Sequence, residues 1–163
     1  MPVWAGRFSY DCAMRAVVQR VLSASVTVNS EVVAQIERGL LVLVGIEASD
    51  TDAQVVWLAD KCANLRIFED PQGKMNLSVK DVAGSILLVP NFTVAGDARK
   101  GRRPSFDNAM RPEQSEPMFQ RLTAATRSQG VPVQTGVFRA DMKVALVNDG
   151  PITIWLDSGG GQA

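Results

Sequence analysis

The segment Val144-Ala145-Leu146-Val147-Asn148-Asp149-Gly150-Pro151-Ile152-Thr153-Ile154-Trp155-Leu156 holds an Asn-Asp-Gly-Pro sequence between two apolar runs. The apolar runs are typical of strands, and the polar residues followed by Gly150-Pro151 predict a turn between them. Proline restricts the residue before it, and a Gly-Pro bond is a candidate for the cis form. The pattern allows two interpretations, which are a plain hairpin turn and a loop that directs backbone carbonyl groups at a ligand.

Strand-like runs also occupy the first part of the chain. Ala16–Val21 and Ala24–Val28 are rich in β-branched residues, and Leu22-Ser23 separates them. Gly39 precedes Leu40–Val44, a continuous apolar run typical of a strand buried on both faces. Shorter strands are predicted over 32–36, 86–89, 133–136 and 142–147, and a turn over 70–73.

Two helices are predicted among these strands. The first spans Thr51 to Arg66, where the first residue and Gln54 form a capping-box pattern and Cys62 lies on the apolar face as a buried thiol. The second spans Glu113 to Ser128, with Pro117 expected in its first turn. Strands before and between two helices predict a single mixed α/β domain in which helices cover one side of the sheet.

The composition limits the classes of protein to which the chain can belong. Its 163 residues, 46% of them hydrophobic, are enough for one domain with a core. Lys plus Arg and Asp plus Glu are both 17, so any contact with nucleic acid depends on a local basic patch. Cys12 and Cys62 predict no disulfide framework, which indicates a reducing cytosol and a cytoplasmic protein. No apolar run approaches the roughly 18 residues that span a membrane.

Met14 opens the regular pattern, so the domain is predicted to span residues 14–158. Residues 1–13 lack the apolar core of a signal peptide and are expected to be an extension outside the fold. Residues 159–163 begin with three glycines and are expected to be a flexible tail.

The chain contains no histidine, so a Ser-His-Asp or Cys-His arrangement cannot form. Two distant cysteines do not predict a zinc site, and no motif for another cofactor occurs, so none is expected. Backbone groups are therefore the better candidates for chemistry. One candidate is Pro90-Asn91-Phe92-Thr93, where exposed N–H groups could stabilise an oxyanion or the chain could simply leave a strand. The other is the Gly150-Pro151 turn.

A basic loop at Arg99-Lys100-Gly101-Arg102-Arg103 holds four cations in five residues. Clustered cations neutralise the phosphates of nucleic acids and release counterions, and the glycine would let the backbone approach closely. The loop is therefore a candidate phosphate-binding patch, and its alternative interpretation is a solvated loop.

A series of segments carries a family resemblance, and they are Met14-Arg15-Ala16-Val17-Val18-Gln19-Arg20-Val21, Gly39-Leu40-Leu41-Val42-Leu43-Val44-Gly45, Leu65-Arg66-Ile67-Phe68-Glu69-Asp70, Gly73-Lys74-Met75-Asn76-Leu77-Ser78, Arg99-Lys100-Gly101-Arg102-Arg103-Pro104-Ser105-Phe106, Gly136, Phe138, Ala140-Asp141-Met142 and Val147-Asn148-Asp149-Gly150-Pro151-Ile152-Thr153. In these segments the chain resembles the D-aminoacyl-tRNA deacylases of the bacterial and eukaryotic type. The resemblance extends from Met14 to about Ser158, which is nearly the whole chain.

This resemblance implies a compact sandwich of sheet layers covered by helices, and a homodimer with active sites at the subunit interface. The substrate would be a tRNA whose 3′-terminal adenosine carries a D-amino acid, or glycine mischarged on alanine tRNA. Hydrolysis of the ester would release the free amino acid and the tRNA. The Gly150-Pro151 bond would be cis, and its carbonyl groups would enter the partner's pocket and leave no room for an L side chain.

The resemblance also implies roles for individual residues. The backbone N–H groups of Phe92 and Thr93 would polarise the ester, while the 2′-OH of the adenosine takes part in activating water and the Thr93 hydroxyl has a secondary part. Arg20 would hold the Gly-Pro element in place. Asn91, Asn148, Phe138 and Met142 would support or line the pocket, and Arg99, Lys100, Arg102 and Arg103 would contact tRNA phosphates.

One segment departs from the family pattern, in which Ser-Gln precedes Phe-Thr. Pro90 has neither a hydroxyl nor an N–H group, and Asn91 is one methylene shorter than glutamine. A related group of deacylases, which acts on L-alanine mischarged on threonine tRNA, also has proline at the first position. The alternatives are therefore an editing deacylase with relaxed chirality, a catalytically inactive nucleic-acid-binding relative, and a hydrolase of small esters.

Overall fold

The strands and helices of the computed structural model lie within residues 13–159, which are the residues that the structure describes. Two segments lie outside this range, which are residues 1–12, with most of the predicted extension and Cys12, and residues 160–163 of the predicted tail. Ala13, the last residue of the predicted extension, is buried. No described helix is long and apolar enough to cross a membrane. The elements are β1 (Arg15–Val28), β2 (Glu31–Ile36), β3 (Gly39–Gly45), α1 (Asp52–Asn64), β4 (Phe68–Glu69), β5 (Met75–Leu77), β6 (Ser85–Pro90), the 3-10 helix η1 (Phe92–Ala95), α2 (Pro112–Ser128), β7 (Val133–Thr135) and β8 (Lys143–Asp157).

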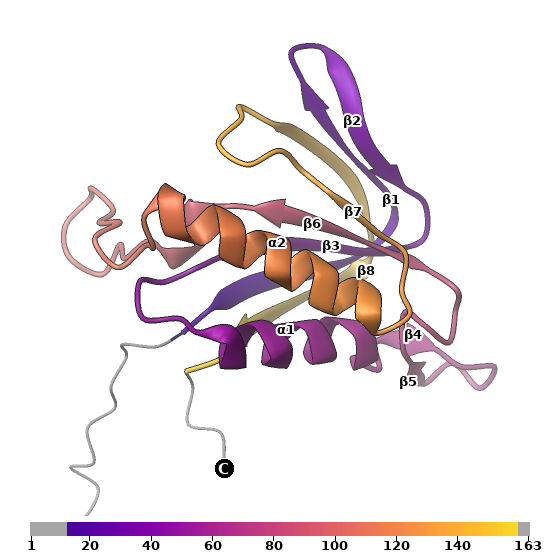
Figure 1. Cartoon of the computed structure of the whole chain (residues 1–163). Coiled ribbons are helices and arrows are strands. Elements are labelled where there is room, and N and C mark those ends of the chain that lie inside the picture. The colour runs from indigo at the N-terminus through magenta and orange to yellow at the C-terminus, as the bar shows by residue number, and fades with distance from the viewer. Residues whose placement is uncertain (1–12, 160–163) are drawn as a thin grey trace, which may run out of the picture.

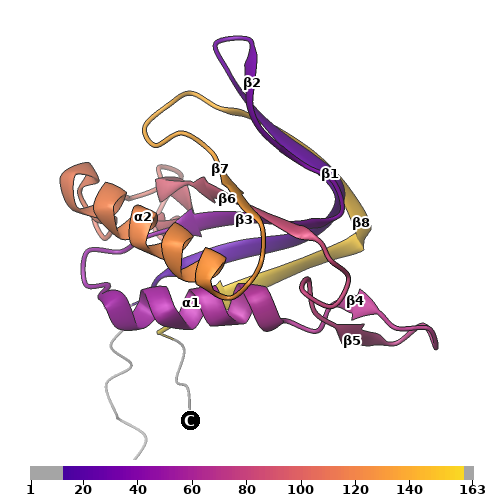
Figure 2. The same cartoon turned by 45° about the vertical axis from the view of Figure 1, so that its right-hand side comes forward.

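The main sheet has the strand order β2-β1-β3-β6-β7, and β8 pairs with β1. β1 is antiparallel to β2, β3 and β8, whereas β3–β6 and β6–β7 are parallel. Helices α1 and α2 lie side by side over one face of this sheet (Figures 1 and 2). The small β4–β5 sheet lies beyond the end of α1 (Figure 2).

Strands β3 and β6 are buried on both faces, as the continuous apolar run predicted. Leu40 and Ile86 belong to the core between the sheet and the helices, together with Leu58 of α1 and Leu122 of α2. A second core lies on the other face, where the long strands β1 and β8 bend away from the helices and carry β2 with them (Figure 2). The predicted α/β sandwich is confirmed, because the bent sheet encloses one core on its concave side and the two helices enclose the other against its opposite face. The second core contains Val21, Ala24, Val26, Ala34, Ile36, Leu41, Leu87 and Val89.

Two predicted breaks in strands are wrong. Residues 15–28 form one strand, and Leu22-Ser23 marks an irregularity at which the register with β8 shifts. The hairpin turn predicted near Gly150 is absent, because β8 runs without interruption from Lys143 to Asp157. Its register places the four residues between Asn148 and Thr153 opposite the single residue Arg20. The polar Gly-Pro segment is therefore a wide bulge inside a strand, which bends the strand without ending it.

Both predicted helices form, with small differences. The capping box of Thr51 and Gln54 is present, and Cys62 is buried, so that burial raises the pKa of its thiol to about 12. Pro112 takes the first position of α2, where its missing N–H group has no cost. Pro117 consequently lies in the second turn of the helix and not in the first. The predicted turn over 70–73 connects β4 and β5, two short strands that the sequence pattern did not predict.

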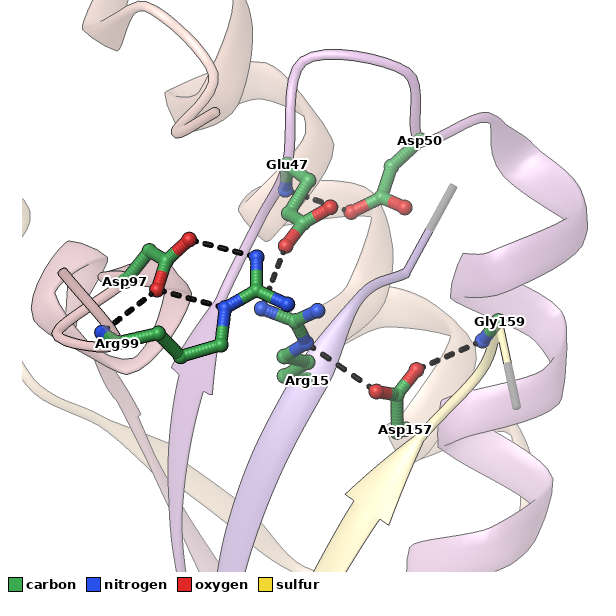
Figure 3. A network of polar contacts seen from close by, with 7 residues as sticks. All are labelled: Arg15, Glu47, Asp50, Asp97, Arg99, Asp157 and Gly159. Carbon is green, nitrogen blue, oxygen red and sulfur yellow. Dashed lines mark hydrogen bonds and ion pairs between the residues drawn. The ribbon is translucent and has the colours of Figure 1, made fainter. Parts of the chain in front are cut away.

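A polar network ties the beginning of β1 to the ends of β3 and β8. Figure 3 shows the Arg15 guanidinium between two carboxylates, 2.8 Å from Glu47 and 3.2 Å from Asp157. The backbone N–H of Glu47 donates to the carboxylate of Asp50 at 2.7 Å. Glu47 and Asp50 are only 2% and 6% exposed. Burial raises the pKa of the Glu47 carboxyl, although the Arg15 guanidinium acts in the opposite direction. Burial also raises the pKa of the Asp50 carboxyl, to about 6.

We predict that Asp50 makes the fold more stable as the pH falls. Its carboxyl has a pKa of 3.8 in the unfolded chain and of about 6 in the folded protein, so the folded state binds the proton more tightly. The stabilisation is complete below the unfolded value and is lost as the pH rises through about 6. The full difference corresponds to about 3 kcal/mol in the free energy of unfolding, and about 2 kcal/mol of it falls between pH 4.5 and pH 7, where urea titrations would measure it.

The variant Asp50→Asn lacks the titrating group, so its unfolding free energy should change less between the two pH values than that of the wild-type protein. Asp60→Asn, on the exposed side of α1, is the matched control and should keep the wild-type difference. An unchanged pH dependence in Asp50→Asn would show that another group is responsible.

Candidate functional site

A cavity of about 760 Å³ lies where the carboxyl ends of β3 and β6 meet the beginning of α2. Its wall is mostly apolar, and its charged members are Arg111, Arg139 and Asp141. This size and character suit a small organic ligand or one end of a larger one. Within residues 13–159, no group of three or more His, Cys, Asp or Glu side chains is arranged to hold a metal ion. The remaining lining residues are Leu43, Val44, Ile46, Val89, Pro90, Asn91, Phe92, Phe106, Ala109, Met110, Pro112, Ser115, Phe138, Ala140, Met142 and Val144.

One wall of the cavity is the beginning of the 3-10 helix η1. The Asn91 N–H donates to the Val44 carbonyl at 2.8 Å and so fixes the point at which the chain leaves β6. Phe92 and Thr93 are the first residues of η1, and the first N–H groups of a helix have no acceptor inside it. A Cβ atom on Gly45 would lie 2.7 Å from the backbone N of Ala95, so only glycine lets η1 pack this closely on β3.

The structure brings four of the predicted site residues together in the cavity wall. Asn91 and Phe92 come from the β6–η1 junction, and Phe138 and Met142 from the segment before β8. Phe92 is 61% exposed, and its ring meets Phe106 edge-on with 5.2 Å between the centroids. The wall therefore offers aromatic and sulfur groups to an apolar or planar ligand.

Thr93 does not line the cavity. Its hydroxyl donates to the Asn91 amide oxygen at 2.5 Å, so the two side chains are joined beside the free N–H groups of η1. Asn91 thus supports this segment through a side-chain contact that its sequence position alone did not indicate.

Gly150 and Pro151 lie in the bulge of β8, outside the cavity wall, and their peptide bond is cis. Gly150 has a φ of +139°, and a Cβ atom there would lie 2.7 Å from the backbone N of Ile152. Both conditions require glycine at this position. Asn148 spans the bulge, because its amide oxygen accepts from the Ile152 N–H at 2.8 Å and its amide nitrogen donates to the Ile152 carbonyl at 3.2 Å.

Arg20 fills the other side of the bulge and is 6% exposed. Its Nε donates to the Asp149 carbonyl at 3.2 Å and lies 3.3 Å from the Asp149 carboxylate. Its Nη1 donates to the Ile67 carbonyl at 2.8 Å, and its guanidinium lies 6.0 Å from the centre of the Phe68 ring. The charge therefore has a carboxylate, two carbonyl groups and an aromatic ring as neighbours, which compensates its burial.

The cavity and the bulge are far apart within one chain. Arg20 pairs with Leu40, which pairs with Ile86, whereas Pro90 pairs with Val44, four residues further along β3. The bulge is also three strand spacings away from β6, because β1 and β3 lie between β8 and β6. With about 3.3 Å per residue along a strand and about 4.8 Å between strands, the separation is roughly 20 Å. Two elements so far apart cannot touch one small ligand from the same chain.

The basic loop of residues 99–103 lies next to the cavity, since Phe106, three residues further along the chain, lines it. Asp97 and Ser105 exchange two backbone hydrogen bonds of 2.7 and 2.8 Å that close the loop. Arg99 pairs with Asp97 at 2.7 Å, and this hydrogen-bonded guanidinium holds the pKa of the Asp97 carboxyl well below its usual range (Figure 3). Lys100, Arg102 and Arg103 are exposed.

Sequence reasoning missed two charged residues of the cavity wall, Arg111 and Arg139. Arg111 precedes α2 as its N-cap residue, and Arg139 lies between Phe138 and Met142 with a left-handed φ of 66°. The lone arginine before Pro112 was not distinguishable from an ordinary surface residue. The spacing of residues 138–142 gives no sign that Arg139 adopts a conformation that most residues avoid.

Known proteins resemble the chain over almost its whole length. Proteins named D-aminoacyl-tRNA deacylase from Desulfitobacterium hafniense and Myxococcus xanthus are 57% and 55% identical to it over 145 and 150 residues, which are 89% and 92% of this chain and 97% and 98% of theirs. A solved structure named c-Myc DNA Unwinding Element Binding Protein is 42% identical with a TM-score of 0.84, over 89% of this chain and 99% of that one. The family model described as D-Tyr-tRNA(Tyr) deacylase matches residues 17–157. The chain belongs to the D-Tyr-tRNA(Tyr) deacylase family.

Proposed function

We propose that this protein hydrolyses the ester that joins a D-amino acid, or glycine, to the 3′-terminal adenosine of tRNA. The observation that carries the proposal is the pair of N–H groups at the beginning of η1, beside a cavity in a chain without histidine. The products are the free amino acid and the tRNA. Family membership supports hydrolysis of D-aminoacyl-tRNA, because relatives that share more than half of the sequence are named D-aminoacyl-tRNA deacylase.

The N–H groups of Phe92 and Thr93 would polarise the ester carbonyl and stabilise the oxyanion of the tetrahedral intermediate. Each such donor contributes about 10²–10³ in kcat in well-studied hydrolases. Among the described lining residues, the only carboxylate is Asp141, an exposed side chain that lies 3.1 Å from Lys143, and the chain has no histidine. The substrate would therefore assist its own hydrolysis, with the 2′-OH of the adenosine helping to activate the water. The terminal adenosine would lie against Phe138 and Met142.

The active site would be completed by a second copy of the chain. Among the described residues, β8 pairs only with β1, so its other edge is unpaired along 15 residues. Val147 and Trp155 on this strand are 51% and 54% exposed, although they are large and apolar. A long unpaired edge with exposed apolar side chains needs a cover. A homodimer would provide this cover and bring the Gly150-Pro151 bulge of one chain to the cavity of the other.

The bulge would then select the chirality of the substrate. Backbone carbonyl groups of Gly150 and Pro151 would occupy the space that the side chain of an L-aminoacyl ester requires. A glycyl ester would be accepted because it has no side chain. These carbonyl groups must be held rigidly if they are to exclude a side chain as small as the methyl group of L-alanine. The hydrogen bonds of Arg20 and Asn148 to the bulge support this role.

A second candidate function is binding of nucleic acid without hydrolysis. The solved relative at 42% identity is named as a DNA-binding protein, and the basic loop beside the cavity would suit either nucleic acid. A further candidate, suggested by the Pro90-Asn91 change, is an editing deacylase that accepts L-alanine on threonine tRNA. Asn91 still contacts Thr93, so the segment retains a supporting side chain despite its shorter amide.

The proposal predicts the fate of one tRNA charged in parallel with D-tyrosine, L-tyrosine and glycine. The D-tyrosyl and glycyl esters should disappear rapidly while the L-tyrosyl ester persists, because only the L side chain would meet the backbone wall. Acid-gel or chromatographic analysis of the remaining charged tRNA measures each rate. Loss of the L ester as well would indicate relaxed editing, and binding without turnover of any ester would favour the nucleic-acid-binding function.

The variant Gly150→Ala should lower the preference for D-tyrosyl over L-tyrosyl tRNA by at least about tenfold, which corresponds to about 1.4 kcal/mol. The added methyl group would displace Ile152 and with it the carbonyl groups of the bulge. Gly73→Ala is the matched control, because Gly73 also has a left-handed φ of +77° but its Cβ would meet nothing within 4 Å. An unchanged D/L ratio in a folded Gly150→Ala protein would exclude the chiral role of the bulge.

The double variant Arg102→Ala/Arg103→Ala should weaken tRNA binding and flatten its dependence on salt. Each lost phosphate contact on a single strand lowers the slope of log K against log salt by about 0.7. Lys74→Ala/Lys80→Ala removes the same charge from exposed positions around β5 and serves as the control. Equal salt slopes for the two double variants would mean that the basic loop is only a solvated surface.

A further inference from the structure

Arg139 occupies an unusual position at the cavity. Its φ of 66° lies in the left-handed region, which a long side chain rarely adopts without cost. Three other described residues besides glycine share this feature, namely Asn29, Ser30 and Ala83, but none of them lines the cavity. Strained residues cluster at functional sites, where the surrounding structure holds them in place.

The segment around Arg139 is held on both sides. Phe138 packs against Phe119 of α2 with 6.4 Å between the ring centroids, and the Ala140 N–H donates to the Val137 carbonyl at 3.2 Å. Met142 then leads into β8 and contacts the position of Gly136. Phe138, Arg139 and Ala140 all line the cavity, so this left-handed turn places Arg139 at the cavity itself.

The charges around the cavity are mainly positive. The Arg139 side chain is 62% exposed and lies 4.0 Å from the Glu113 carboxylate, which is 73% exposed. Because both groups are largely in water, this ion pair is weak and leaves the guanidinium able to bind another anion. Arg111, the second guanidinium of the wall, forms no salt bridge with any residue from 13 to 159. Among the described lining residues, the single carboxylate is Asp141, which lies 3.1 Å from Lys143 in a still more exposed pair.

We propose that Arg139 and Arg111 bind the phosphate group that precedes the terminal adenosine of the tRNA. This inference rests on the proposed function. With the adenine against Phe138 and Met142 and the ester at Phe92, the 5′-phosphate must remain where the cavity opens to solvent. A guanidinium offers two parallel N–H donors to phosphate oxygens, which fixes orientation as well as charge. The two arginines would thus position the adenosine so that its ester reaches η1.

A comparison of two substrates tests this assignment. One is D-tyrosyl-tRNA, and the other is D-tyrosyl adenosine, which carries the same ester but has no phosphate. Arg139→Gly should keep the melting temperature or raise it by up to about 2–4 °C, since glycine accepts the left-handed backbone. The same variant should lose roughly five- to tenfold in kcat/KM on the tRNA, mostly through KM, and should be unchanged on the adenosine ester.

Three further variants complete the test, and the first two separate the effect of charge from that of backbone strain. Arg139→Lys keeps the charge in the same conformation and should retain most of the salt dependence of tRNA binding. Ala83→Gly relieves a left-handed residue of φ 53° that lies before β6 and away from the cavity, and should not change binding at all. Arg111→Gln should reproduce the selective loss on the tRNA.

Equal losses on both substrates, or no loss on the tRNA, would overturn the proposal, because phosphate contact cannot affect a substrate without phosphate. If the wild-type protein cleaves neither ester, the proposed function is wrong. The role of Arg139 is then decided by binding of uncharged tRNA, for which the Arg139→Gly variant should show a salt slope lower by about 0.7. An unchanged slope would overturn the assignment independently of catalysis.

Discussion

The buried guanidinium of Arg20 is the contact on which the shape of the sheet's outer edge depends. A charge that is 6% exposed must be compensated, and here the compensation comes from backbone oxygens of two distant segments, Asp149 and Ile67. Because four residues of β8 stand opposite this one residue of β1, the ladder cannot satisfy them, and Arg20 with Asn148 supplies hydrogen bonds in its place. Removal of the guanidinium would take this donor from the carbonyl groups of Asp149 and Ile67 and leave Asn148 to hold the bulge.

Under the proposed function, the cavity would use backbone groups where many hydrolases use side chains. Free N–H groups at the beginning of η1 are available only if η1 lies close to β3, and Gly45 permits this approach. Donors held by packing need no reorganisation when charge develops on a substrate, which is the physical advantage of such a site. Under the proposed function, the same reasoning applies to the bulge, where carbonyl groups would replace side chains as the selective element.

The sequence predicted those parts of the molecule that depend on local pattern. The two-sided burial of β3 and β6, the capping box at Thr51 and the cis candidate at Gly150-Pro151 all follow from residue types at short spacing. The continuity of β8 does not, because a Gly-Pro segment indicates a turn unless Arg20 on another strand is known to fill the bulge. Arg139 was not predicted either, since arginine has no preference for the left-handed backbone that the structure gives it.

The separation of roughly 20 Å between bulge and cavity has a consequence for how this chain can change in evolution. Under the proposed dimer, Gly150 of one subunit acts in the cavity formed by Phe92, Phe138 and Arg139 of the other. Substitutions on the two sides would then couple through the interface and not through the fold of one chain, although they lie in one polypeptide. Any shift of the β8 edge would move the carbonyl groups of the bulge relative to the N–H donors of η1 in the other subunit. The exposed apolar residues of this edge would therefore be conserved for catalysis as well as for assembly.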